Sequence, residues 1–314
     1  MWKDYKTIKK DKSLFVSEFG FQSPANYQTW KEVLPKKDRQ IQSRNFEFHN
    51  KQIEGPERLM KFLSAHLRIT ENFREFLYLT QLNHAFAMKE CIMHWRGRFP
   101  ASNGAIIWQL NDCYPVSSWA LIDSASIRKL PYYMVKHCFA PQAIAVSEKG
   151  EELEIKILNN SLHELSASLT VHLVNLPKGK TELLTKLDIE TKPMIMLDAL
   201  TVPVNECLRN GTHLLVISLL SNDGEILFRD VWNAIEWKYL KLPRVKITAR
   251  ITEDSIILNS DKPAFYLCVE HPDFVFDKNL LIILPDELHV VKELKGLKIK
   301  KKKLEIQCLN NFTD

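Results

Sequence analysis

The pattern of hydrophobic and polar positions changes near residue 140 and divides the chain into two kinds of structure. Before that point, apolar residues recur at three- and four-residue spacing, which predicts helices. After it, short stretches alternate with a period of two and are separated by polar turns, which predicts strands. The pattern therefore predicts a helix-rich first part followed by an all-β remainder.

Two helices are predicted in the first part. One begins at Pro56, because proline is favoured in the first helical turn. A longer one runs from Thr70, a candidate N-cap, to about His94. Both carry an apolar face, so both are predicted to pack on a core.

Two strands are predicted in the same part, at 14–18 and 104–110. Leu14, Phe15 and Val16 form an apolar run that is typical of a buried strand. Glu18 then places one carboxylate in this run. Burial of a lone carboxylate is costly unless it is paired or used in chemistry.

The all-β part is predicted to form two β-sandwich domains, 141–240 and 241–314, each of a size typical of immunoglobulin-like domains. The predicted strands of the first are 152–158, 167–176, 212–220 and 225–232, and those of the second are 245–251, 256–260, 264–270, 280–284 and 297–309.

Composition excludes several classes of protein. The 314 residues are 45% hydrophobic and 26% charged, and no apolar run reaches the roughly 18 residues that span a bilayer. The net charge of +5 is scattered, and we interpret its densest run, Lys300–Lys303, as a solvated strand or edge protection. No basic and aromatic residues interleave as in nucleic-acid-binding proteins. We expect neither a membrane nor a nucleic-acid partner.

The six cysteines indicate a reducing compartment. None forms a CxxC pair or has a histidine at zinc-ligand spacing, so we expect free thiols, no metal and no cofactor. The basic stretch 1–13 has no apolar segment behind it and does not have the form of a signal peptide. This slightly favours the cytoplasm, while a lysosomal or secreted protein stays open if a leader has been lost with the N-terminus.

Two long motifs resemble the β-mannosidases of glycoside hydrolase family 2. They are "FVSEFGFQSPANYQTW" at 15–30 and "GAIIWQLNDCYPVSSWALID" at 104–123, and "LPYYMVKHCFAPQ" at 130–142 follows in the family's order. The resemblance implies that residues 1–140 are the C-terminal portion of a (β/α)8 TIM barrel. In this interpretation the fold is α/β in the barrel part and all-β in two immunoglobulin-like sandwiches.

The resemblance also implies roles for four residues. Glu18 matches the catalytic nucleophile of the family; without the motif it would be interpreted as a salt-bridged glutamate at a strand end. Trp108 matches a position where an aromatic ring lies beneath the sugar, although a core tryptophan is the alternative. Asn111 and Asp112 follow at the strand end; they either bind sugar hydroxyls and fix Glu18, or cap a turn.

A retaining glycosidase needs a second carboxyl group about 5–5.5 Å from the nucleophile. In this family that group is a glutamate after an asparagine, upstream of the nucleophile, and no glutamate precedes Glu18. The one Asn-Glu pair, Asn205-Glu206, lies between predicted sandwich strands and fits a turn. The chain is therefore predicted to be truncated and inactive alone.

Three functional readings follow. In the first, the chain acts on a β-mannoside or another oligosaccharide together with the missing N-terminal part of the enzyme. In the second, it is a non-catalytic carbohydrate-binding or scaffold remnant. In the third, it is a truncation product without function.

Overall fold

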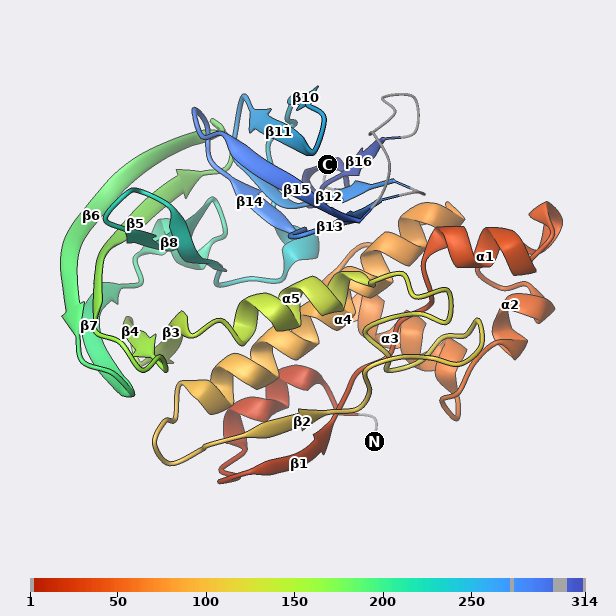
Figure 1. Cartoon of the computed structure of the whole chain (residues 1–314), viewed down its shortest axis with the longest axis horizontal. Coiled ribbons are helices and arrows are strands. Elements are labelled where there is room, and N and C mark those ends of the chain that lie inside the picture. Colours follow the sequence, from red (N-terminus) through yellow and green to blue (C-terminus); the bar gives the residue numbers. More distant parts are fainter. Residues whose placement is uncertain (1–2, 272–273, 296–303, 313–314) are drawn as a thin grey trace. The chain divides into compact units, whose positions relative to one another are not determined.

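A computed structural model describes residues 3–271, 274–295 and 304–312 (Figure 1). The lysine run Lys300–Lys303, which we interpreted as a solvated strand, lies outside these residues. No helix within the described ranges is long and apolar enough to cross a membrane.

The chain forms two compact units. One comprises Met1–Trp95 and Pro100–Lys136, and the other comprises Arg96–Phe99 and His137–Asp314. The first is rich in helices and the second in strands, which agrees with the predicted change of pattern.

The first unit contains α-helices (α), 3-10 helices (η) and two strands (β). The elements up to the end of its last helix are η1 (Tyr5–Lys10), β1 (Val16–Phe19), α1 (Tyr27–Val33), η2 (Lys36–Asp38), α2 (Arg44–Phe48), α3 (Gly55–His66), α4 (Phe73–Arg96), β2 (Ala105–Ile107) and α5 (Leu130–Cys138).

The strands β1 and β2 lie side by side and run parallel (Figure 1). Val16 pairs with Ala105, and Phe19 pairs with Ile107. Parallel strands require a long crossover connection, which here contains the helices α1 to α4. The positions of both predicted strands are confirmed, although the observed strands are shorter.

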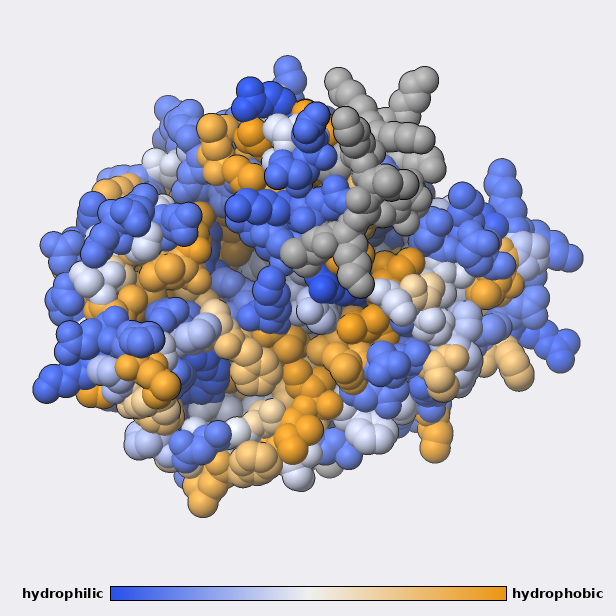
Figure 2. All heavy atoms as spheres, viewed as in Figure 1, coloured by the Kyte–Doolittle hydropathy of each residue, from blue (hydrophilic) through white to orange (hydrophobic). Residues whose placement is uncertain are grey.

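The predicted burial of the first strand is wrong for two of its three residues. Leu14 is 68% exposed and Phe15 is 58% exposed. Leu14 and Phe15 precede the paired residues of β1. Within the described ranges, β2 is the one strand that pairs with β1, so this sheet offers no further strand to cover their side chains. Ile106 of β2 is 54% exposed, and Figure 2 shows hydrophobic residues at the surface over these two strands.

The long helix α4 supplies much of the core of this unit. Seventeen of its residues are buried, among them Phe76, Leu79 and His84. Its N-cap is Asn72 rather than Thr70, because the Asn72 Oδ1 accepts hydrogen bonds from the backbone N–H groups of the first turn, including that of Glu75 at 3.2 Å. The Thr70 hydroxyl instead lies 2.7 Å from the Glu75 carboxylate.

The second unit begins with two antiparallel sheets, of strand order β3-β4-β7 and β6-β5-β8-β9. Figure 1 shows β5 and β6 as long curved strands. The bounds are β3 (Gln142–Lys149), β4 (Glu152–Asn159), β5 (Leu165–Asn175), β6 (Lys180–Thr191), β7 (Ile195–Pro203), α6 (Glu206–Arg209), β8 (His213–Ser221), β9 (Ile226–Trp232) and η3 (Trp237–Tyr239).

Two further sheets follow, of order β10-β11-β15-β13 and β14-β12-β16. Both contribute to one hydrophobic cluster that includes Leu258, Leu267 and Ile283. The bounds are β10 (Ile247–Ile251), β11 (Ser255–Ser260), β12 (Ala264–Glu270), β13 (Val275–Phe276), β14 (Leu281–Ile283), β15 (His289–Lys295), β16 (Glu305–Gln307) and η5 (Leu309–Phe312). The prediction of a β-rich part after residue 140 is confirmed.

A buried arginine joins the first pair of sheets to the second. The Arg229 guanidinium, on β9, donates to both carboxylate oxygens of Glu287 at 2.6 and 2.7 Å and to the carbonyl oxygen of Ile282 at 3.0 Å. Its Nε donates to the Ser218 hydroxyl at 2.8 Å. Arg229 is 6% exposed, so the guanidinium of this bidentate pair is shielded from water.

Candidate active site

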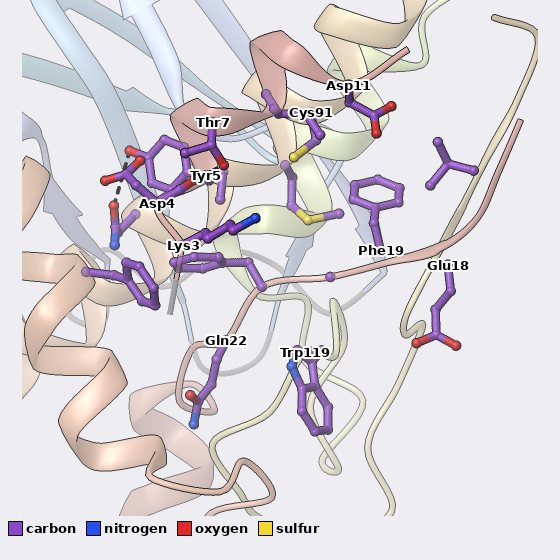
Figure 3. Close-up of a pocket in the computed structure, with 18 of the residues that line it drawn as sticks. Lys3, Asp4, Tyr5, Thr7, Asp11, Glu18, Phe19, Gln22, Cys91 and Trp119 are labelled. Atoms are coloured by element: carbon purple, nitrogen blue, oxygen red, sulfur yellow. Dashed lines mark hydrogen bonds between the residues drawn. The ribbon is translucent and has the colours of Figure 1, made fainter. Parts of the chain in front are cut away.

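Glu18 lies near the carboxyl end of β1 with its side chain exposed. Figure 3 shows it on the opposite side of the strand from Phe19, whose ring packs edge-on against Trp95 at 4.7 Å between centroids. Among the described residues, none forms a hydrogen bond or ion pair with the Glu18 carboxylate. The alternative of a salt-bridged glutamate is therefore not what this structure shows.

A hollow of about 730 Å³ lies beside this strand, lined by η1, β1, α3, α4 and Trp119. Glu18 shares the hollow with two other carboxylates, Asp4 and Asp11, and Figure 3 shows both well apart from it. Neither aspartate is free. Asp4 lies 2.9 Å from the His66 ring nitrogen, and Asp11 accepts a hydrogen bond of 2.9 Å from the Trp95 indole.

The hydrogen bond from the Trp95 indole lowers the pKa of Asp11, so this residue stays ionised and does not resemble a proton donor. Cys91 also lines the hollow, but burial raises the pKa of its thiol to about 12. A thiol that is so rarely ionised is a poor nucleophile. Glu18 is thus the one carboxylate of the hollow without a hydrogen-bonding or ionic partner in the described part of the chain.

Trp108 follows β2 directly and is 47% exposed. Its backbone N–H donates to the carbonyl oxygen of Phe19 at 2.8 Å, which brings the tryptophan next to the strand of Glu18. The peptide bond between Trp108 and Gln109 is cis. A Cβ atom on Gly20 would lie 2.0 Å from the carbonyl oxygen of Trp108, so the chain needs glycine there.

Asn111 and Asp112 have different environments. Asn111 is exposed, whereas Asp112 is 5% exposed. The Asp112 carboxylate is bonded to the Lys51 ammonium at 2.8 Å and to the Ser118 hydroxyl at 2.5 Å. Asp112 therefore fixes the loop after β2 and does not bond Glu18; a contact of either residue with a sugar stays a prediction.

Polar residues that the sequence did not indicate hold the segment after β1. The His84 ring, fully buried on α4, lies 2.9 Å from the Ser23 hydroxyl, and burial followed by the charge of Lys129 lowers the pKa of His84 well below its ordinary value. Gln81 of α4 donates to the carbonyl oxygen of Pro24 at 3.1 Å. These contacts fix the backbone that follows Glu18.

Asp123 holds the next part of the same segment. Its carboxylate accepts five hydrogen bonds, from the backbone and side chain of Asn26, the Thr29 hydroxyl, and the backbone N–H groups of Ala125 and Ile127. A carboxylate with so many donors is structural.

No protein-family model matches the chain. It is 26% identical over 313 residues to β-mannosidase B of Aspergillus niger, an alignment that covers 92% of this chain and 37% of that protein. It is 27% identical over 310 residues to β-mannosidase B of Emericella nidulans, covering 90% of this chain and 36% of the relative. The chain thus spans little more than a third of the length of these curated relatives.

Solved structures give the same picture. The crystal structure of a β-D-mannosidase from Dictyoglomus thermophilum matches all of this chain with a TM-score of 0.90 and 27% identity, over 39% of its own length. An exo-chitosanase of Amycolatopsis orientalis matches 98% of this chain with a TM-score of 0.74, and at 16% identity it shares the fold alone. The chain is therefore similar, along nearly its whole length, to the C-terminal portion of β-mannosidases, and the resemblance to those of glycoside hydrolase family 2 is confirmed.

Proposed function

We propose that this chain is the C-terminal part of a retaining β-mannosidase and that Glu18 is its nucleophile. The observation that carries the proposal is the exposed carboxylate of Glu18 at a strand end, which has no bonding partner in the described part of the chain, within a chain that resembles β-mannosidases along its length. A carboxylate with a structural role would be expected to have partners, as Asp112 and Asp123 do.

We interpret β1 and β2 as the last two strands of a (β/α)8 barrel within residues 1–140. They pair in parallel and are joined by a helical crossover, which is how neighbouring strands of such a barrel are arranged. Glu18 lies near the carboxyl end of β1, and active sites of such barrels lie at the carboxyl ends of the strands. The exposed Leu14, Phe15 and Ile106 fit strands whose further neighbours lie outside this chain. Residues 141–240 and 241–314 would then be two immunoglobulin-like sandwiches.

In the proposed reaction, a Glu18 oxygen attacks the anomeric carbon and the glycosidic bond breaks. A second carboxyl group gives its proton to the leaving oxygen, and water later releases the sugar from Glu18. Trp108, half-exposed and adjacent to the strand of Glu18, offers an indole face to the sugar C–H groups. Asp4 and Asp11 lie apart from Glu18 and are bonded elsewhere, so neither of these two carboxylates of the hollow suits the role of proton donor, and we place the donor in the N-terminal part of the enzyme.

The experiment is complementation. The chain is mixed with, or joined to, the N-terminal part of the Dictyoglomus thermophilum β-mannosidase, and release of an aryl group from an aryl β-mannoside is measured. We expect no turnover by the chain alone, turnover by the complemented protein, and a loss of about 1000-fold or more in Glu18→Gln. Glu32→Gln, which changes an exposed glutamate of α1, is the matched control.

Turnover by the chain alone that survives in Glu18→Gln would refute the proposal. The second candidate, a non-catalytic carbohydrate-binding remnant, is favoured by the absence of a second carboxylate beside Glu18 among the described residues. It predicts saturable binding of mannose to the chain in calorimetry, together with failure of complementation.

A further inference from the structure

Lys129, the residue before α5, is completely buried. Its Nζ donates to the carbonyl oxygen of Ser23 at 2.8 Å and, over a longer distance of 3.4 Å, to that of Ser118. These two carbonyl groups are its acceptors among the described residues, and no carboxylate there lies within ion-pair distance of it. A buried lysine without an ion pair is rare.

The two acceptors belong to a backbone bridge that joins the segments following β1 and β2. The Ser23 N–H donates to the carbonyl of Ser118 at 3.0 Å, and the Ser118 N–H donates to that of Ser23 at 3.1 Å. Lys129 therefore touches both halves of the bridge. One half follows Glu18 in the chain, and the other directly precedes Trp119, which lines the same hollow as Glu18.

The number of acceptors matches a neutral amine. An amine has two N–H groups for these two carbonyls, whereas an ammonium has three and would leave one N–H without an acceptor in a buried site. An unsatisfied buried donor on a charged group is strongly unfavourable. The closed bridge thus fits the deprotonated side chain better than the protonated one.

The charges around Lys129 do not reverse this preference. Asp112 and Asp123 favour the ammonium, but both are already bonded to other groups, and Lys51 opposes it. Burial is the largest effect and lowers the pKa of Lys129 to about 7. His84, which faces the same bridge, stays neutral because burial keeps its pKa low.

We propose that Lys129 is a proton-sensitive clamp on the Ser23–Ser118 bridge, which closes the bridge as the neutral amine and loosens it when it takes up a proton. The segment after Glu18 and the loop that carries Trp119 then separate more easily in acid than in base. The consequence for catalysis, that the clamp positions Glu18 and Trp119, rests on the proposed function. The clamp itself does not depend on the proposed function.

The sign of the pH effect follows from linkage. When the bridge opens, water reaches the lysine and its pKa rises towards the ordinary 10.5, so the open form binds more protons than the closed form between about pH 7 and 10. Closure therefore becomes more favourable as the pH rises through this range, by at most about tenfold per pH unit.

The test is amide hydrogen exchange of the whole chain without substrate, read from peptides covering 20–26 and 115–121. After correction for intrinsic exchange, the protection of the Ser23 and Ser118 amides should rise about 10- to 100-fold from pH 7 to 9 and stay level below pH 7. In Lys129→Met this rise should disappear. Lys136→Met, which changes an exposed lysine of α5, should behave as the wild type.

Two outcomes would overturn the proposal: protection of these amides that does not change with pH in the wild type, or a rise that persists in Lys129→Met. If that variant does not fold, a titration of the lysine ε-carbons by NMR in the wild type decides. One lysine should titrate near pH 7, and titration of every lysine near pH 10 would exclude the clamp. Because neither measurement uses a glycoside, a failure here is distinct from a failure of the proposed function.

Discussion

Replacing Glu287 by glutamine should destabilise the second unit by removing the charge that faces Arg229. Glutamine keeps the size of the side chain but can no longer form the two short hydrogen bonds of 2.6 and 2.7 Å to the guanidinium. The buried arginine would be left without a counter-charge, which is the unfavourable way to break such a pair.

The magnitude follows from the pKa of Glu287. Burial alone would raise it, but hydrogen bonds from Arg229 and His289 and the charge of Arg229 outweigh burial and lower it from 4.5 to about 2. At about 1.4 kcal/mol per pKa unit this corresponds to roughly 3 kcal/mol. The Glu287 side chain is 30% exposed, so water screens part of the interaction, and we expect about 2 kcal/mol.

The pH dependence has a definite sign. The pKa is lower in the folded protein than in the unfolded chain, so the contribution is complete above about pH 4.5 and is lost as the pH falls towards 2. Urea unfolding followed by far-UV circular dichroism should show the full difference between wild type and Glu287→Gln at pH 7 and less than half of it at pH 3. Glu225→Gln, in an exposed turn, controls for the general effect of removing a charge.

Equal destabilisation by Glu287→Gln at pH 7 and pH 3 would show that the charge of Glu287 does not stabilise the folded protein. A loss of stability at pH 7 no larger than that of Glu225→Gln would show the same.

Two further predictions concern the first unit. Gly20→Ala should destabilise it by about 3 kcal/mol or more, because the new Cβ would lie 2.0 Å from the carbonyl oxygen of Trp108. Thermal unfolding measures the loss of stability, and the control Ser17→Ala, on the strand just before Gly20, should change it little. Iodoacetamide at pH 8 should alkylate the exposed Cys113 and spare Cys91, because burial raises the pKa of the Cys91 thiol to about 12. Peptide mass mapping measures the two alkylation rates, and equal rates would contradict this prediction.

The apolar stretches of the second part predicted strands that have many buried residues. They located β4, β5 and β8, each of which has several buried aliphatic residues, and β9, in which Phe228, Arg229 and Val231 are buried. They missed β3, β6 and β7. In β6 and β7 most residues are exposed or half-buried, so that charged and apolar side chains mix without a clear face. A strand whose two faces are similarly exposed shows only a weak alternation of polar and apolar residues, and its sequence is therefore hard to assign.

The candidate site was predicted in part. The motifs indicated Glu18 and Trp108, and the structure shows why they are neighbours: the Trp108 N–H bonds the residue after Glu18. Burial of Leu14 was predicted wrongly, because an apolar run does not reveal whether another layer covers it. Nothing in the sequence distinguishes Lys129 from a surface lysine, since its burial depends on two distant carbonyl groups.

The hydrogen bonds of Asp123 also set the order in which this chain can fold during synthesis. They reach Asn26 and Thr29 across 97 and 94 positions of sequence. At about 5–20 residues per second, a ribosome needs roughly 5–20 s to add the residues that separate these partners. During that time Asn26 and Thr29 have been made and their acceptor Asp123 has not, so the segment that follows β1 can form these hydrogen bonds only after Asp123 has left the ribosome.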